Sequence, residues 1–168
     1  MNKTLFAALS EQANHELYAS HCYRAMAIWC DDSDYNGYAS FFQKQATEEL
    51  EHADQFIRHL LDRSTLPHLT AITEPKVEFS KLREVAEHAQ VLEQRNSANI
   101  HRCYEIAIEV KDYASQPMLL ELIKEQVEEE SWAETMVTLT RRAECSGATY
   151  NLDRHIVKEL SSPEGVEV

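Results

Sequence analysis

The chain has 168 residues, which suits one domain over residues 1–168 with a substantial hydrophobic core. Only 3 Gly and 4 Pro occur, and this composition favours long helices over sheets, whose turns need those residues. A net charge of −13 argues against nucleic acid and anionic membranes as partners, because both need basic patches; the surplus acid either attracts cations or simply keeps a helical protein soluble.

The N-terminal segment does not resemble a targeting signal. Its residues, MNKTLFAALSEQ, are too short and too polar for a signal peptide. No run of about 18 apolar residues occurs, so no membrane span is expected. We therefore expect a cytoplasmic protein. Its four cysteines, none of them in a C-x-x-C pair, are expected to be buried and reduced rather than bound to zinc.

The first half of the chain predicts a helical hairpin and a long connection. Helices are expected over residues 4–31 and 39–63, and the turn-forming run DSDYNG between them would make the pair antiparallel. Residues 66–79 contain Pro67 and Pro75 and lack helical periodicity. This stretch is long enough to cross the whole bundle, so the third helix need not run antiparallel to the second.

The second half predicts two more long helices and a short one. The expected helices cover residues 80–112, 116–146 and 151–160. Ser80 suits the N-cap of the first, Ser115 precedes the second, and Gly147 suits the C-terminal cap of that second helix. Pro163 would close the ordered part. The predicted fold class is therefore all-α.

Each long helix carries a stripe of inward-facing positions, spaced alternately by four and three residues, which we call the core stripes. Acidic and amide side chains interrupt the apolar ones on these stripes, and no Lys or Arg occurs there. The core stripes contain Leu5, Leu9, Gln12, Glu16, Ala19, Tyr23, Met26 and Cys30; Phe42, Gln45, Glu49, His52 and Phe56; Leu82, Ala86, Ala89, Glu93, Asn96, Ile100, Cys103, Ala107 and Val110; and Leu119, Leu122, Gln126, Glu129, Ala133 and Met136.

Two stretches of the chain repeat one pattern on the core stripes. The first reads Glu…E-x-x-H and the second Glu…Q-x-x-E, each with 33 residues from its first member to its second. A carboxylate on one helix facing an i, i+3 ligand pair on the next, repeated once, is how four-helix di-iron sites are built. The six residues of the pattern are Glu16, Glu49, His52, Glu93, Gln126 and Glu129.

Ionised carboxylates on the core stripes need a counter-charge. Burying one costs several kcal/mol, so four of them would rival a typical net stability of ~5–15 kcal/mol. Joint protonation would leave a wet core, whereas two divalent ions neutralise the charge and use the oxygen lone pairs. Carboxylates with one or two nitrogen donors suit iron or manganese, while structural zinc prefers Cys and His.

The six residues divide into two unequal sites. Glu49 can bridge two ions, with Glu16 and His52 completing the first site. The second site would have only oxygen donors and a weak amide, from Glu93, Gln126 and Glu129. A weaker second site would let an ion leave after oxidation, which suits iron in transit more than a permanent cofactor.

The chain resembles a bacterial non-haem ferritin over nearly its whole length. The similarity lies in the motifs NHELYAS, EELEH, LEQ and EQVEEE and in the short final helix. It implies a ferritin-like four-helix bundle with a long crossover between the second and third helices and a short fifth helix. It also implies assembly as a hollow homo-24-mer shell, and a ferroxidase that oxidises Fe(II) with O₂ or peroxide and stores Fe(III) mineral for iron homeostasis and detoxification.

The resemblance also assigns roles to residues. It places the first iron on Glu16, Glu49 and His52, and the second on Glu49, Glu93 and Glu129 with Gln126 close by. It matches a third iron site to Glu48, Glu125 and Glu128. From the residues alone, an ordinary solvated acidic face is the favoured reading of this last group. Tyr23 is either a packed core tyrosine or a redox-active or hydrogen-bonding neighbour of the metals.

Related classes fit less well. Bacterioferritin would have a second E-x-x-H and a haem-binding methionine after the bridging Glu, where this chain has Gln126-x-x-Glu129 and Leu50. We therefore expect no haem. Two alternatives come from other classes. A di-iron oxygenase would need an apolar pocket beside the metals, and a non-catalytic subunit of a mixed shell should have lost ligands.

Overall fold

The computed structural model of the chain describes residues 1–160, and it contains five helices and no strand in that range. The helices are α1 (Lys3–Asp32), α2 (Asn36–Asp62), α3 (Leu82–Glu109), α4 (Gln116–Arg142) and α5 (Ser146–Leu160). The all-α prediction is confirmed, whereas the predicted end of order at Pro163 lies outside the described residues. No helix in this part of the chain is both long and apolar enough to cross a bilayer.

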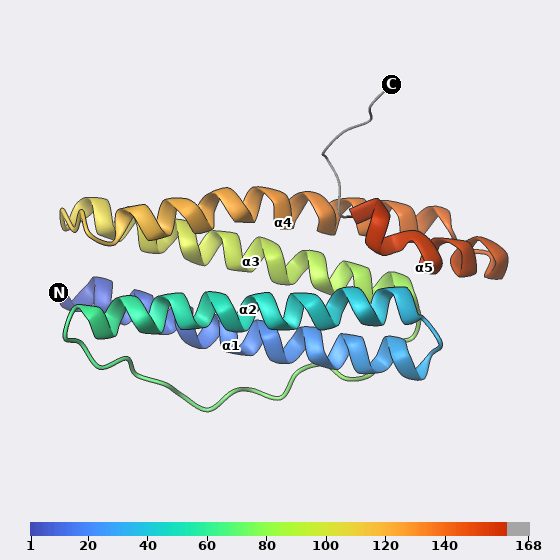
Figure 1. Cartoon of the computed structure of the whole chain (residues 1–168), viewed down its shortest axis with the longest axis horizontal. Coiled ribbons are helices and arrows are strands. Elements are labelled where there is room, and N and C mark those ends of the chain that lie inside the picture. The colour runs from blue at the N-terminus through green and yellow to red at the C-terminus, as the bar shows by residue number, and fades with distance from the viewer. Residues whose placement is uncertain (161–168) are drawn as a thin grey trace, which may run out of the picture.

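The four long helices lie side by side as two pairs (Figure 1). Helices α1 and α2 form an antiparallel hairpin, as do α3 and α4. The crossover between α2 and α3 runs the length of the bundle beside α1, so α3 starts at the same end as α2. Helix α5 lies across one end, in contact with α2 and α4. The predicted long crossover and short fifth helix are therefore confirmed.

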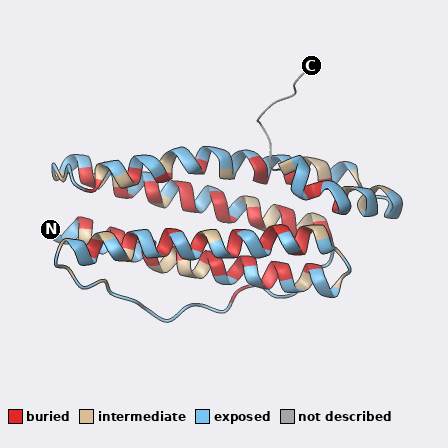
Figure 2. Ribbon diagram, in the orientation of Figure 1, coloured by how far each residue is buried: buried red, intermediate tan, exposed pale blue. Residues whose placement is uncertain are grey.

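The core consists of two apolar clusters with polar side chains between them. One cluster, around Tyr23 and Phe42, lies toward the α5 end, and the other, around Leu9 and Phe56, lies toward the opposite end. Buried residues follow the inward faces of the helices (Figure 2). Between the clusters are seven buried polar residues, which we call the polar band: Gln12, Glu16, Glu49, His52, Glu93, Asn96 and Gln126.

The start of α2 differs from the prediction because of a contact that is distant in sequence. The helix begins at Asn36, inside the expected turn, rather than at residue 39. Asp153 of α5 accepts hydrogen bonds from the backbone nitrogens of Gly37 and Tyr38, at 3.0 and 3.1 Å. These bonds satisfy amide groups that a helix N-terminus leaves free. Gly37 is therefore needed for the approach of α5 rather than for a turn.

The other boundary errors concern helix caps. Ser80 is not the N-cap of α3; it lies outside the helix, and its backbone and hydroxyl both donate to Glu84 at 2.7 Å. Helix α3 ends at Glu109, and Lys111, two residues later, has a left-handed φ of 57°. Helix α4 ends at Arg142 and not near residue 146, and Gly147 lies inside α5 instead of capping α4.

The expectation that all four cysteines are buried is wrong for one of them. Cys22, Cys30 and Cys103 are buried free thiols, but Cys145 is exposed in the connection between α4 and α5. Its exposure follows from the early end of α4, which leaves this residue outside both helices.

Candidate metal centre

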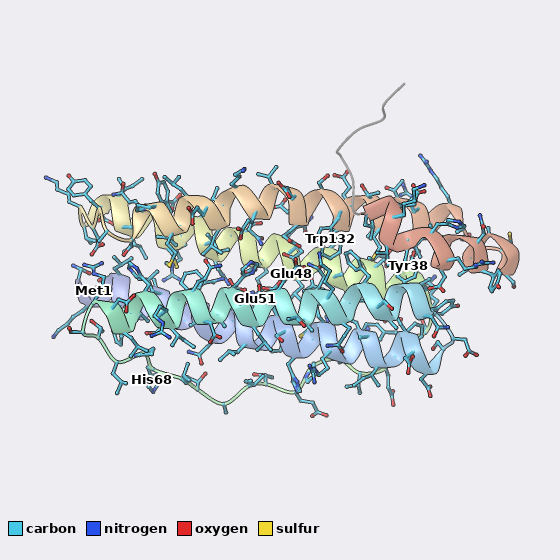
Figure 3. The ribbon with its side chains drawn as sticks, in the orientation of Figure 1. Met1, Tyr38, Glu48, Glu51, His68 and Trp132 are labelled. Carbon is cyan, nitrogen blue, oxygen red and sulfur yellow. The ribbon has the colours of Figure 1, made fainter. Side chains whose placement is uncertain are left out.

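The candidate site occupies the polar band at mid-length of the bundle, and each of the four long helices contributes to it. Helix α1 lies close against α3, whereas α2 and α4 make no close backbone contact within the described residues. Long polar side chains join α2 to α4 instead. Figure 3 shows Glu48 of α2 and Trp132 of α4 near the middle of the bundle.

Glu16, Glu49 and His52 form the most compact set of metal-binding groups. One ligand atom from each lies within 4.8 Å of the other two. The two carboxylates are 0% and 1% exposed and the imidazole is 9% exposed, so water cannot compensate for their charge. Nδ1 of His52 lies 3.2 Å from Glu49 Oε2. Oε2 of Glu16 is buried and has no hydrogen-bond partner, which leaves a lone pair free for a cation.

Glu93 is held by two donors from different helices. The hydroxyl of Tyr23 donates to its Oε1, and Nε2 of Gln126 donates to its Oε2 at 3.4 Å. Ser97 in turn donates to Oε1 of Gln126 at 2.8 Å, which turns the amide nitrogen of Gln126 toward the carboxylate. Gln126 therefore supports Glu93 here, and its expected role as a metal ligand stays a prediction.

Glu129 is anchored through one of its two oxygens. Its Oε2 accepts hydrogen bonds from Nε2 of Gln45, at 3.0 Å, and from the indole nitrogen of Trp132. The Trp132 ring packs edge-on against Phe41, with centroids 4.8 Å apart, and lies 6.3 Å from the Tyr23 ring. This arrangement leaves Oε1 of Glu129 available. Glu49, Glu93 and Glu129 do not form a set as compact as that of Glu16, Glu49 and His52. The expected second site is therefore more open than the first.

Electrostatics shows how unfavourable the ionised carboxylates are in this site. Burial, reinforced by the neighbouring carboxylates, raises the pKa of Glu16 and of Glu49 well above the ordinary range. Burial also raises the pKa of Glu93 to about 7 and that of Glu129 to about 8. Four acids competing for protons in one volume form a site that a pair of divalent cations would relieve.

The residues expected at a third iron site are more exposed. Glu125 and Glu128 are exposed and Glu48 is half-buried. Oε2 of Glu125 lies 3.3 Å from Nε2 of His52, which connects this group to the first site. Glu48 pairs with Lys44 at 3.2 Å, as an ordinary surface acid does. The third site stays a prediction.

Several polar residues of the centre were on the core stripes but had no role assigned from the sequence. Nε2 of Gln12 donates to Glu16 at 2.7 Å and to Asn96 at 2.6 Å. Gln45, Ser97 and Trp132 support Gln126 or Glu129, as described above. For Gln12, Gln45 and Asn96, the sequence signal that could have indicated a role was an amide side chain on a core stripe. No sequence pattern distinguished Trp132.

Fold and site together define a four-helix-bundle protein with a carboxylate-rich candidate metal centre. A family model described as a ferritin-like domain matches residues 6–143. The chain is 38% identical over 157 residues to the bacterial non-heme ferritin of Staphylococcus aureus strain USA300, covering 93% of this chain and 95% of that one. It is 39% identical over 157 residues to that of Staphylococcus saprophyticus, covering 93% and 94%.

Solved structures give the same result. An open-pore ferritin from Archaeoglobus fulgidus superposes with a TM-score of 0.89 at 31% identity, covering 98% of this chain and 99% of that one. The chain therefore belongs to the ferritin family, and its predicted resemblance to bacterial non-haem ferritins is confirmed.

Proposed function

We propose that the protein stores iron and is a ferroxidase, oxidising Fe(II) at the centre formed by Glu16, Glu49, His52, Glu93 and Glu129. The observation that carries this proposal is the cluster of Glu16, Glu49 and His52 within 4.8 Å. In the described part of the chain, no Lys or Arg pairs with any of these carboxylates. The cations that the site lacks are then supplied by its substrate.

The residues divide the work between two positions. Fe(II) binds first where Glu16, Glu49 and His52 already converge, and Glu49 extends to a second ion that Glu93 and Glu129 complete. Each Fe(II) gives one electron to dioxygen, which takes up two protons and leaves as hydrogen peroxide; peroxide itself is the alternative two-electron acceptor. Hard carboxylate oxygens stabilise Fe(III) more than Fe(II), which drives the electron transfer.

In this proposal, iron leaves the centre at the surface between α2 and α4 and is stored beyond it. Glu48, Glu125 and Glu128 lie at or near this surface, and Glu125 contacts His52. They would bind ions that leave the centre, which is the role of the proposed third iron site. Assembly as a 24-mer shell would make this surface the wall of a cavity for Fe(III) mineral, and a cytoplasmic location is proposed with it. The relatives' description as non-heme ferritins supports a protein without haem.

The proposal is tested by Glu49→Ala, compared with Glu51→Ala as the matched control. Glu49 is buried at the centre of the proposed site, whereas Glu51 is exposed on the same helix. Stopped-flow absorbance with oxygen uptake should show that Glu49→Ala abolishes the rapid oxidation phase while Glu51→Ala keeps it. The apo-variant should remain folded, because removing one of several mutually repelling buried acids relieves the core. An unchanged initial rate in Glu49→Ala would show that oxidation occurs elsewhere.

A further inference from the structure

A polar cavity lies outside the proposed iron centre, between α1, α3 and the crossover. Its volume is about 480 Å³, and its walls include Gln12, His15, Thr70, Thr73, Arg95 and Arg102. The crossover passes beside α1 along this flank (Figure 1). Gln12 separates the cavity from the centre, since its amide nitrogen is committed to Glu16 and Asn96. The cavity is therefore a distinct site.

The crossover wall of this cavity is held in place. Asn14 of α1 donates from its amide to the carbonyl of His68 at 2.7 Å. The amide oxygen of Asn14 accepts from the backbone nitrogen of Thr70 at 2.8 Å and from the Thr70 hydroxyl at 3.1 Å. Three hydrogen bonds from one side chain thus fix the residues that cover the cavity. This is the construction of a preformed pocket rather than of a gap under a passing chain.

The charge of the cavity is opposite to that of the molecule. The chain has 29 acidic and 16 basic residues, yet this cavity has two arginines and a single acid, Glu11, on its walls. Arg95 and Arg102 are exposed, and within residues 1–160 neither makes an ion pair or a side-chain hydrogen bond with another residue. Nε2 of His15 is buried and lacks a partner as well. Two exposed guanidiniums and the half-buried imidazole of His15 therefore line one volume without a hydrogen-bond partner from the protein.

We propose that this cavity binds a small oxyanion of the phosphate class between Arg95 and Arg102. A planar guanidinium presents paired N–H donors that match the oxygens of a phosphate, and two of them supply the charge that a dianion needs. His15 and the hydroxyls of Thr70 and Thr73 offer further partners at the walls. A metal cation, by contrast, would meet two positive charges, so the cavity is not an iron entrance.

The test is isothermal titration of the intact, metal-free protein with inorganic phosphate, in chloride at constant ionic strength and with a chelator present. The wild-type chain should bind saturably at one site, and Arg95→Gln or Arg102→Gln should weaken binding by about tenfold or more, because each loses a charge-assisted contact. Arg24→Gln is the matched control, since Arg24 is exposed on α1 and does not line the cavity. It should bind phosphate as the wild type does.

Two results would overturn the proposal. One is wild-type binding no stronger than that of the Arg95→Gln and Arg102→Gln double variant. The other is an equal loss in Arg24→Gln, which would mean diffuse attraction of anions to surface arginines. A parallel titration with a hexose phosphate identifies the source: tighter binding than inorganic phosphate points to a phosphorylated metabolite, and equal or weaker binding points to the free ion. Either result supports the site, provided that Arg95→Gln and Arg102→Gln both bind phosphate more weakly than the wild type.

Discussion

At the scale of single residues, the centre is prepared by donors that hold its carboxylates in place. Tyr23 and Gln126 donate to the two oxygens of Glu93, whereas Trp132 and Gln45 both donate to one oxygen of Glu129 and leave the other free. Such bonds favour the ionised carboxylate, against a burial that favours the neutral acid. The carboxylates thus stay oriented before any ion arrives, so little reorganisation is needed on binding.

Replacing Trp132 by Phe should weaken the second iron-binding step. The ring still packs against Phe41, but the indole donor to Glu129 is lost, so the carboxyl holds its proton more tightly. Losing a hydrogen bond to a charged group costs about 1.5–3 kcal/mol, or about tenfold or more in affinity. Anaerobic Fe(II) calorimetry resolves the two steps. Trp29→Phe is the control, because Trp29 packs on Tyr35 and Phe79 away from the centre. Equal weakening of both steps would contradict the division into two sites.

Apo-protein stability should fall as the pH rises from about 7 to about 9. The folded-state pKa values of Glu93 and Glu129 are raised to about 7 and about 8, above those of the unfolded chain. The stability they contribute is therefore complete at low pH and is lost as the pH rises through these values. Burial, aided by Arg95, lowers the pKa of His15 to about 4, and that residue destabilises the fold only below about pH 6.5.

Thermal midpoints measured with a chelator at pH 7, 8 and 9 check this slope. Glu129→Gln should flatten the decline, because a neutral amide neither repels its neighbours nor titrates. A midpoint that does not fall over the same interval would mean that these carboxyls are already ionised in the apo-protein at pH 7.

At the scale of elements, α5 is fastened to the bundle through the start of α2. A β-carbon added to Gly37 would lie 1.8 Å from the backbone oxygen of Asp153, so only glycine lets the two helices approach this closely. The buried side chain of Ile156 completes the contact from α5. The packing of α5 on this end of the bundle therefore depends on Gly37, which has no side chain.

Gly37 and Gly147 should respond to alanine in opposite directions. Gly37→Ala forces α5 away and should cost about 1–3 kcal/mol, as overpacking does. Gly147→Ala meets nothing within 4 Å inside a helix and should stabilise by about 0.5 kcal/mol. Hydrogen exchange of the α5 amides, together with the thermal midpoint, measures both effects. If exchange in α5 were unchanged by Gly37→Ala, the docking contact would not be what holds this helix.

The helices were predictable from the sequence where their signal is periodic, and not where it is a single residue. The spacing of Glu16 and Tyr23 along α1 follows the core stripe because an amphipathic helix repeats its inward face. Gly147 predicts a cap because glycine commonly ends helices, but α4 stops earlier, at Arg142. The start of α2 depends on Asp153, more than a hundred residues away in the chain, and no local rule includes such a partner.

At the scale of the whole molecule, the polar band separates the two apolar clusters. The apolar clusters at either end hold the helices together, which allows the middle to carry acids that weaken the apo-fold. The six residues of the repeated pattern could be picked out from the sequence because four core stripes carry polar residues at one level. Donors such as Ser97 and Trp132 could not, because a supporting contact such as Ser97 to Gln126 depends on helix rotation.

Iron binding inside the bundle is measured most directly by anomalous scattering from crystals soaked anaerobically in a ferrous salt. We predict one iron peak among Glu16, Glu49 and His52, and a second, weaker peak among Glu49, Glu93 and Glu129. An empty bundle centre at saturating Fe(II), with iron only on exposed acids, would contradict this prediction.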